Sequence, residues 1–135
     1  METFQFNSNF LDVKDKFSNI CKIRYLDWNY RKNNNTIFCV HGITRNCRDF
    51  DYLADSLSKD YRVICPDIVG RGESDWLENK SDYNYRTYCK HILYILKHIE
   101  ISSVDFIGTS MGGIIGIYLA AYYPRMIRSL VLNDI

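Results

Sequence analysis

The sequence lacks the features that mark membrane, secreted and nucleic-acid-binding proteins. Its longest apolar stretch, Ile114 to Tyr123, is far too short to span a bilayer. The N-terminus shows neither the basic segment nor the apolar segment of a signal peptide. The 17 Lys and Arg residues are scattered among 16 Asp and Glu residues, which gives a net charge of +1 and no phosphate-binding stripe. We therefore expect a cytoplasmic protein that binds neither membrane nor nucleic acid.

The cysteines also lack the spacing of a disulfide framework or a zinc site. There are five, at positions 21, 39, 47, 65 and 89, an odd number with no C-x-x-C pair. Cys39 and Cys65 fall in predicted buried strands, where a free cysteine behaves as a small apolar residue. We expect free thiols in a reducing compartment, no bound metal and no cofactor.

What the sequence does contain is a regular alternation of strand and helix patterns, without internal repeats. Apolar or alternating runs predict strands at residues 21–25, 37–40, 63–65, 104–107 and 130–132. Helical spacing predicts helices over 50–57, 88–99 and 111–123, the last ended by Pro124. The run Asn33 to Asn35 predicts a turn between strands.

This order predicts an α/β fold, a mostly parallel sheet with helices on both faces, in one domain spanning residues 1–135. Right-handed crossovers place the loops that carry chemistry at the carboxyl ends of the strands. The third helix is apolar nearly all round, so we expect it to be buried under the sheet.

The most informative segment runs from Val104 to Gly113. An apolar strand leads directly into Gly108-Thr109-Ser110-Met111-Gly112, and an apolar helix pattern follows at once. This is the Gly-x-Ser-x-Gly nucleophile elbow in the strand–turn–helix context that it requires. The turn holds the serine in a strained conformation with its hydroxyl exposed, and side chains at 108 and 112 would crowd it.

Four segments in order resemble the α/β-hydrolase superfamily. They are His41-Gly42-Ile43-Thr44, the run Pro66 to Trp76 (which contains Gly70-Arg71-Gly72-Glu73-Ser74-Asp75), the elbow at Ser110, and Leu130 to Asp134. The resemblance covers nearly the whole chain from about residue 20. It covers only the first half or so of the family's fold, which is truncated after the strand that follows the nucleophile helix.

The resemblance assigns roles to individual residues. Ser110 would attack a carbonyl carbon and form an acyl-enzyme. The backbone N–H of Met111 follows the nucleophile and is one oxyanion-hole donor by geometry, and the resemblance places the second donor at Ile43. His41 holds this loop in place and is not the base, while Gly42 lets the loop approach the substrate. Gly108 and Gly112 support the elbow.

The loop around Gly70-Arg71-Gly72 does not fit a dinucleotide site. It lacks the third glycine, since position 75 is Asp, and it is not the first strand–helix turn. We expect a structural loop in which Arg71 and Glu73 are solvated or paired. Trp76 and Leu77 are expected to pack in the core, with an acyl pocket as the alternative.

A Ser–His–acid triad is incomplete in this chain, because no histidine follows Ser110. His91 and His98 lie on the second predicted helix and are expected at the surface. Asp134 is the one candidate for the acid, against a simple strand-end turn. Without a general base Ser110 keeps an ordinary hydroxyl, so we expect the chain alone to be nearly inert.

Three interpretations remain open. The chain is the N-terminal part of a serine hydrolase whose other half supplies the acid and the histidine and acts as its partner. Alternatively it is a short, catalytically dead relative kept as a binding or interaction module, or it uses the elbow as a lyase or acyltransferase. Serine at 110 argues against dehalogenases and epoxide hydrolases, which use aspartate. The family implies an ester or other small acyl substrate.

Overall fold

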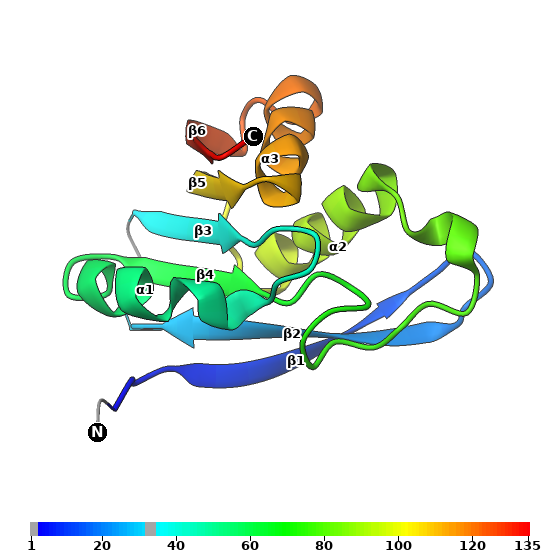
Figure 1. The fold of residues 1–135 in the computed structure, drawn as a ribbon, viewed down its shortest axis with the longest axis horizontal. Helices are drawn as coiled ribbons and strands as arrows, with labels where there is room; N and C mark the ends of the chain where they lie inside the picture. Colours follow the sequence, from blue (N-terminus) through cyan, green and yellow to red (C-terminus); the bar gives the residue numbers. More distant parts are fainter. Residues whose placement is uncertain (1–2, 32–34) are drawn as a thin grey trace.

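The computed structural model describes residues 3–31 and 35–135, and its centre is a six-stranded sheet. The strands lie in the order β1 (Asn7–Lys14), β2 (Ile20–Trp28), β4 (Arg62–Pro66), β3 (Thr36–Val40), β5 (Val104–Thr109) and β6 (Ile127–Asn133). β2 pairs antiparallel with both β1 and β4, whereas β4, β3, β5 and β6 are parallel to one another (Figure 1). The predicted mostly parallel sheet is confirmed.

Three α-helices connect the parallel strands. They are α1 (Asp51–Leu57), which follows the 3-10 turn η1 (Cys47–Phe50), α2 (Tyr85–His98), which follows η2 (Lys80–Asp82), and α3 (Met111–Tyr122). The side chain of Asn84 caps α2 by accepting a hydrogen bond from the Thr87 amide. Tyr123, which precedes Pro124, ends α3 as predicted.

Alternate residues of each buried strand enter different cores, which explains the continuous apolar runs. On β3, Phe38 and Val40 join a core with residues of α2 and α3, while Ile37 and Cys39 join a second core with Phe50 and Ala54 beside α1. Helices therefore cover both faces of the sheet, as Figure 1 shows. All five cysteines are free.

Three expectations need correction or addition. The sequence reasoning missed β1, whose residues are mostly exposed. The helix α3 is not fully buried, because β5, β6 and α2 cover only one side of it and Ile117, Tyr118 and Tyr122 stay exposed. His91, expected at the surface, is only 8% exposed, on a helix that contacts β1. The predicted turn at Asn33 and Asn34 lies outside the described residues.

Candidate active site

Ser110 lies between β5 and α3 with φ 52° and ψ −115°. Residues other than glycine rarely adopt this backbone conformation. Its amide donates to the Asn133 carbonyl at 3.0 Å, which ties the turn to the end of β6. Its hydroxyl is half-buried and makes no hydrogen bond with any residue of 3–31 or 35–135. The strained turn therefore presents a free hydroxyl at the carboxyl end of the central strands.

The glycines on either side of Ser110 are sterically required. A Cβ on Gly108 would overlap the backbone of Gly112, and a Cβ on Gly112 would overlap the carbonyl of Val40 at the end of β3. These obstacles are backbone atoms and cannot rotate away. The elbow closes only because both positions lack a side chain.

The loop after β3 lies against the elbow. A Cβ built on Gly42 would be 3.6 Å from the Ser110 Cβ, which is ordinary van der Waals contact. The loop turns through a hydrogen bond from the Arg45 amide to the Gly42 carbonyl at 3.1 Å. Within the part of the chain that the structure describes, the amides of Ile43 and Met111 donate to no protein acceptor. Two unpaired donors thus belong to the segments that meet at Ser110.

His41 is fully buried and both of its ring nitrogens are engaged. Nε2 accepts a hydrogen bond from the Ile68 amide at 3.0 Å, so the ring proton lies on Nδ1, which donates to the Gly42 carbonyl at 2.7 Å. Burial lowers the pKa of His41, in keeping with this neutral form. The ring joins the loop after β3 to the loop after β4.

Asp67, at the start of the loop after β4, is the centre of a buried hydrogen-bond network. Its carboxylate accepts from the Cys47 amide at 2.8 Å and the Glu73 amide at 2.9 Å, and it lies 3.9 Å from the Arg24 guanidinium. Ser74 Oγ donates to the Asp67 carbonyl. The loop is therefore held both by its own residues and by Cys47 and Arg24.

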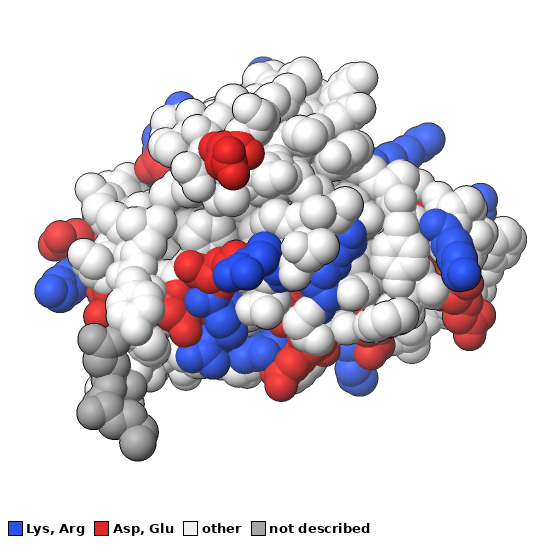
Figure 2. Space-filling view, viewed as in Figure 1, with Lys and Arg blue, Asp and Glu red and all other residues white. Residues whose placement is uncertain are grey.

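The charged side chains of this loop are paired. Glu73 forms an ion pair with Arg24, and Arg71 donates to the Ile43 carbonyl at 2.9 Å and lies over the Tyr88 ring. Figure 2 shows red and blue side chains interleaved over this part of the molecule. The sequence did not predict the hydrogen bond between Arg71 and Ile43, because no local pattern connects residues 28 positions apart.

Trp76 and Leu77 behave differently from each other. Leu77 is partly buried against the core, as expected, whereas Trp76 is 79% exposed. The expectation that Trp76 packs in the core is wrong, because the loop turns its side chain outward at the end of the β1–β2 hairpin.

None of the three histidines can act as a base for Ser110 through a hydrogen bond in this structure. His41 is fully engaged, and His91 and His98 both lie on α2. Asp134 follows β6 with φ 52°, and its exposed carboxylate pairs with no described residue. The described residues thus hold a free serine hydroxyl and two unpaired amides, and no described histidine forms a hydrogen bond with that hydroxyl.

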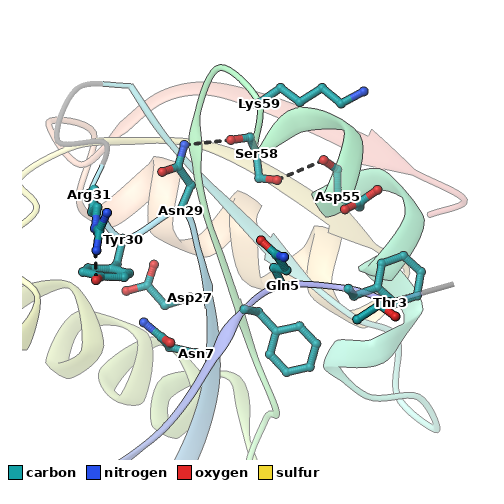
Figure 3. Close-up of a pocket in the computed structure, with 12 residues that line it drawn as sticks. Thr3, Gln5, Asn7, Asp27, Asn29, Tyr30, Arg31, Asp55, Ser58 and Lys59 are labelled. Carbon is teal, nitrogen blue, oxygen red and sulfur yellow. Dashed lines mark hydrogen bonds between the residues drawn. The ribbon is translucent and has the colours of Figure 1, made fainter.

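A hollow of about 710 Å³ lies at the opposite end of the sheet, where β2 ends and β4 begins. Asn29, Ser58 and Arg31 line it, and Asn29 Nδ2 donates to the Ser58 carbonyl at 2.7 Å (Figure 3). Ligand sites in parallel sheets lie at the carboxyl ends of the strands, so this hollow is on the wrong side for the elbow.

Among residues 3–31 and 35–135 no group of three His, Cys, Asp or Glu side chains has the arrangement of a metal site. In the same residues, no helix combines the length and the apolar character that crossing a bilayer requires.

The comparison with known proteins agrees with this geometry. The alpha/beta hydrolase fold family matches residues 35–135, and the chain therefore belongs to that family. It is 40% identical over 114 residues to the 3-hydroxybutyrate-oligomer hydrolase of Cupriavidus necator, covering 84% of this chain and 39% of the relative. It is 30% identical over 98 residues to a serine hydrolase-like protein of Danio rerio, covering 73% of this chain and 30% of that protein.

Solved structures show the same fold. A proposed hydrolase from Rickettsia typhi superposes with a TM-score of 0.86 at 40% identity, covering 97% of this chain and 48% of that one. An alpha/beta hydrolase from Novosphingobium aromaticivorans gives 0.82 at 30% identity, covering 99% and 46%. The chain thus spans less than half the length of each of these four proteins.

Proposed function

We propose that residues 1–135 are the nucleophile-bearing part of a serine hydrolase that acts on an ester or another small acyl compound. The observation that carries this proposal is the conformation of Ser110, with φ 52° and ψ −115° between two sterically required glycines. A strained serine with a free hydroxyl at the carboxyl end of a parallel sheet is the arrangement that acyl transfer uses.

In the proposed reaction, Ser110 Oγ forms a bond to the carbonyl carbon while a base takes the hydroxyl proton. The tetrahedral intermediate then collapses, the bond to the alcohol breaks, and the base returns the proton to the leaving oxygen. Water repeats the sequence on the acyl-enzyme and releases the acid. No cofactor enters these steps.

The amides of Ile43 and Met111 are the proposed donors to the oxyanion. Both are unpaired in the described residues, and Gly42 brings the first of them against the elbow. The His41 ring and the Arg71 guanidinium hold the loop through the carbonyls of residues 42 and 43. The loss of one such donor slows acyl transfer by roughly a hundred- to a thousandfold.

The base of the proposed hydrolase comes from outside residues 1–135, since His41, His91 and His98 are placed for other roles. Asp134 is kept as the candidate acid. The partner that completes the site is the remaining half of the fold, and residues 1–135 by themselves are expected to be nearly inert. The free cysteines support a cytoplasmic location.

A catalytically dead binding module is the second candidate. The observation that favours it is the absence, within the described residues, of any base that reaches Ser110. The two proposals differ in one property, the reactivity of the serine hydroxyl.

Labelling with a fluorophosphonate tests the nucleophile. The full-length chain here means residues 1–135 together with the proposed remaining half of the fold. We expect it to be labelled on Ser110, and we expect Ser110→Ala to lose the label and to lower ester turnover roughly a thousandfold or more. Ser102→Ala, an exposed serine before β5, is the matched control. The first substrates to assay are 3-hydroxybutyrate oligomers, because one relative is a 3-hydroxybutyrate-oligomer hydrolase. An unlabelled Ser110 in the full-length chain would favour the binding module.

The oxyanion hole has its own test. Ile43 is the second residue of the turn closed by Gly42 and Arg45, a position that accepts proline. Ile43→Pro removes the amide hydrogen and keeps the turn, so turnover should fall by roughly a hundredfold or more while labelling at Ser110 slows. Ile43→Val is the control. Unchanged turnover in the proline variant would remove Ile43 from the oxyanion hole.

A further inference from the structure

A second hollow lies between the β1–β2 hairpin and the start of α2, and none of the residues assigned to the elbow lines it. Its volume is about 680 Å³. The walls come from the end of β1 and the hairpin turn, from the loop that begins at Trp76, and from the first two turns of α2. Figure 1 shows the hairpin turn reaching the loop that precedes α2.

Cationic side chains outnumber the carboxylates in this hollow by one. Lys14, Lys16, Arg86 and Lys90 line it, and none forms an ion pair with a described carboxylate. The carboxylates Asp15, Glu78 and Asp82 also line it.

The Asp15 carboxylate is occupied within the hairpin turn. It accepts hydrogen bonds from the Phe17 and Asn19 amides, each at 2.8 Å, and from the Asn19 side chain. These hydrogen bonds leave the negative charge of Asp15 in place, so four cations face three carboxylates in this hollow.

The N-terminus of α2 adds to this positive field. Asn84 caps the Thr87 amide, but the amides of Tyr85 and Arg86 donate to no acceptor in the described residues. Arg86 and Lys90 are four residues apart and so share one side of the helix. Exposed helix N-terminal amides and adjacent cations together favour an anion.

His91 provides an independent sign of a ligand. It lines the hollow and is 8% exposed, yet its Nδ1 has no hydrogen-bond partner in the described residues. Leaving a buried polar atom without a partner is unfavourable. Because Nδ1 itself has almost no accessible surface, a bound polar group supplies the missing hydrogen bond only when the ring turns toward the hollow.

The rim of the hollow is apolar. Phe17, Ile20 and Trp76 line it and are 70%, 59% and 79% exposed. Large apolar side chains gathered around a hollow mark a binding surface. An inorganic anion would leave these side chains in water, whereas a ligand with an apolar chain would cover them.

We propose that this hollow binds a small organic carboxylate with an apolar chain. The carboxylate lies between Arg86, Lys90 and the N-terminus of α2, within reach of His91, and the chain lies against Phe17, Ile20 and Trp76. This site is separate from the elbow, and its occupancy does not require Ser110 to be a nucleophile.

Titration with octanoate tests the proposal. The full-length chain is labelled with 5-fluorotryptophan, and Trp76→Phe assigns the Trp76 signal in the ¹⁹F NMR spectrum. Octanoate is expected to shift this signal saturably, while Trp28, which is 1% exposed and does not line the hollow, stays unshifted and reports an intact fold. A Trp76 signal that does not respond to millimolar octanoate would overturn the proposal.

Two variants and a second probe separate charge from apolar contact. Arg86→Gln with Lys90→Gln should weaken octanoate binding roughly tenfold or more, while Lys97→Gln near the other end of α2 should leave it unchanged. Octylammonium, with the same chain and the opposite charge, should not bind. Equal binding of octylammonium, or unchanged affinity in the double variant, would show that no carboxylate site exists here.

Discussion

Two neighbouring regions at the carboxyl ends of the strands differ sharply. In the loop cluster, residues 41–51 and 67–75, the carboxylate of Asp67, the ring of His41 and the guanidinium of Arg71 all have partners inside the chain. On the α3–β6 side, formed by α3 and β6, large apolar side chains stay exposed and the Ser110 hydroxyl has no partner among the described residues. Figure 2 shows the difference as interleaved charges below and an almost white surface above.

The difference shows which of the two regions is held together by contacts within residues 1–135. The loop cluster is closed by hydrogen bonds between segments of residues 1–135, so its geometry needs nothing else. The α3–β6 side fixes the backbone of Ser110 but leaves apolar side chains in water, and the Ser110 hydroxyl has no partner among the described residues.

The largest effect is expected where the two regions touch, at Gly112. A Cβ there would overlap the carbonyl of Val40 and also that of His41 in the loop cluster, so Gly112→Ala should lower the free energy of unfolding by about 3 kcal/mol or more. Urea unfolding of the full-length chain measures this. Gly42→Ala is the control, because its Cβ would make only ordinary contacts, the nearest at 3.6 Å. Equal stability of the two variants would contradict the close approach of β3 to the elbow.

The next prediction concerns the centre of the loop cluster. In Asp67→Asn an amide group replaces one acceptor oxygen and faces an N–H donor, so we expect a loss of about 2 to 3 kcal/mol in urea unfolding. Asp55→Asn, an exposed carboxylate on α1 without a hydrogen bond to the described residues, should change stability by less than about 0.5 kcal/mol. If both variants behave alike, Asp67 does not hold the cluster together.

Sequence reasoning recovered the parts of the molecule that local patterns define. The elbow from Val104 to Gly113 and the apolar run of β3 could be predicted because their periodicity and glycine spacing are local. β1 was missed because only Leu11 and Val13 of its apolar residues turn inward, and most of the strand is exposed. The role of Asp67 as a centre and the burial of His91 depend on contacts between distant segments, which no local pattern shows.

His91 is the exception that sharpens the comparison, because it is buried outside the loop cluster with an Nδ1 that has no partner among the described residues. Burial, with a smaller contribution from Lys90, lowers the pKa of His91 to about 4 in the folded chain. The unfolded chain, with a histidine pKa of about 6.5, binds the proton first as the pH falls. Stability is therefore lost as the pH falls from about 6.5 toward 4, by about 2 kcal/mol at pH 5.

His91→Leu should remove this share of the acid destabilisation, which urea unfolding at about pH 7.5 and about pH 5 measures. His98→Leu, an exposed histidine on the same helix, should keep the behaviour of the unchanged chain. Some pH dependence will remain in His91→Leu because burial also lowers the pKa of His41. Identical pH profiles for the two variants would mean that His91 is solvated.

The smallest effect is expected on the α3–β6 side. Tyr122 is 72% exposed, and its ring stacks on Tyr118 with the centroids 6.1 Å apart. Because most of the ring is already in water, Tyr122→Ser should cost less than about 1 kcal/mol in urea unfolding of residues 1–135. The same substitution in a chain where another segment covers α3 would remove a buried ring and cost about 3 kcal/mol or more. A large loss of stability in the full-length chain would therefore show that another segment covers α3 there. The contrast between the two regions would then be a property of residues 1–135 alone.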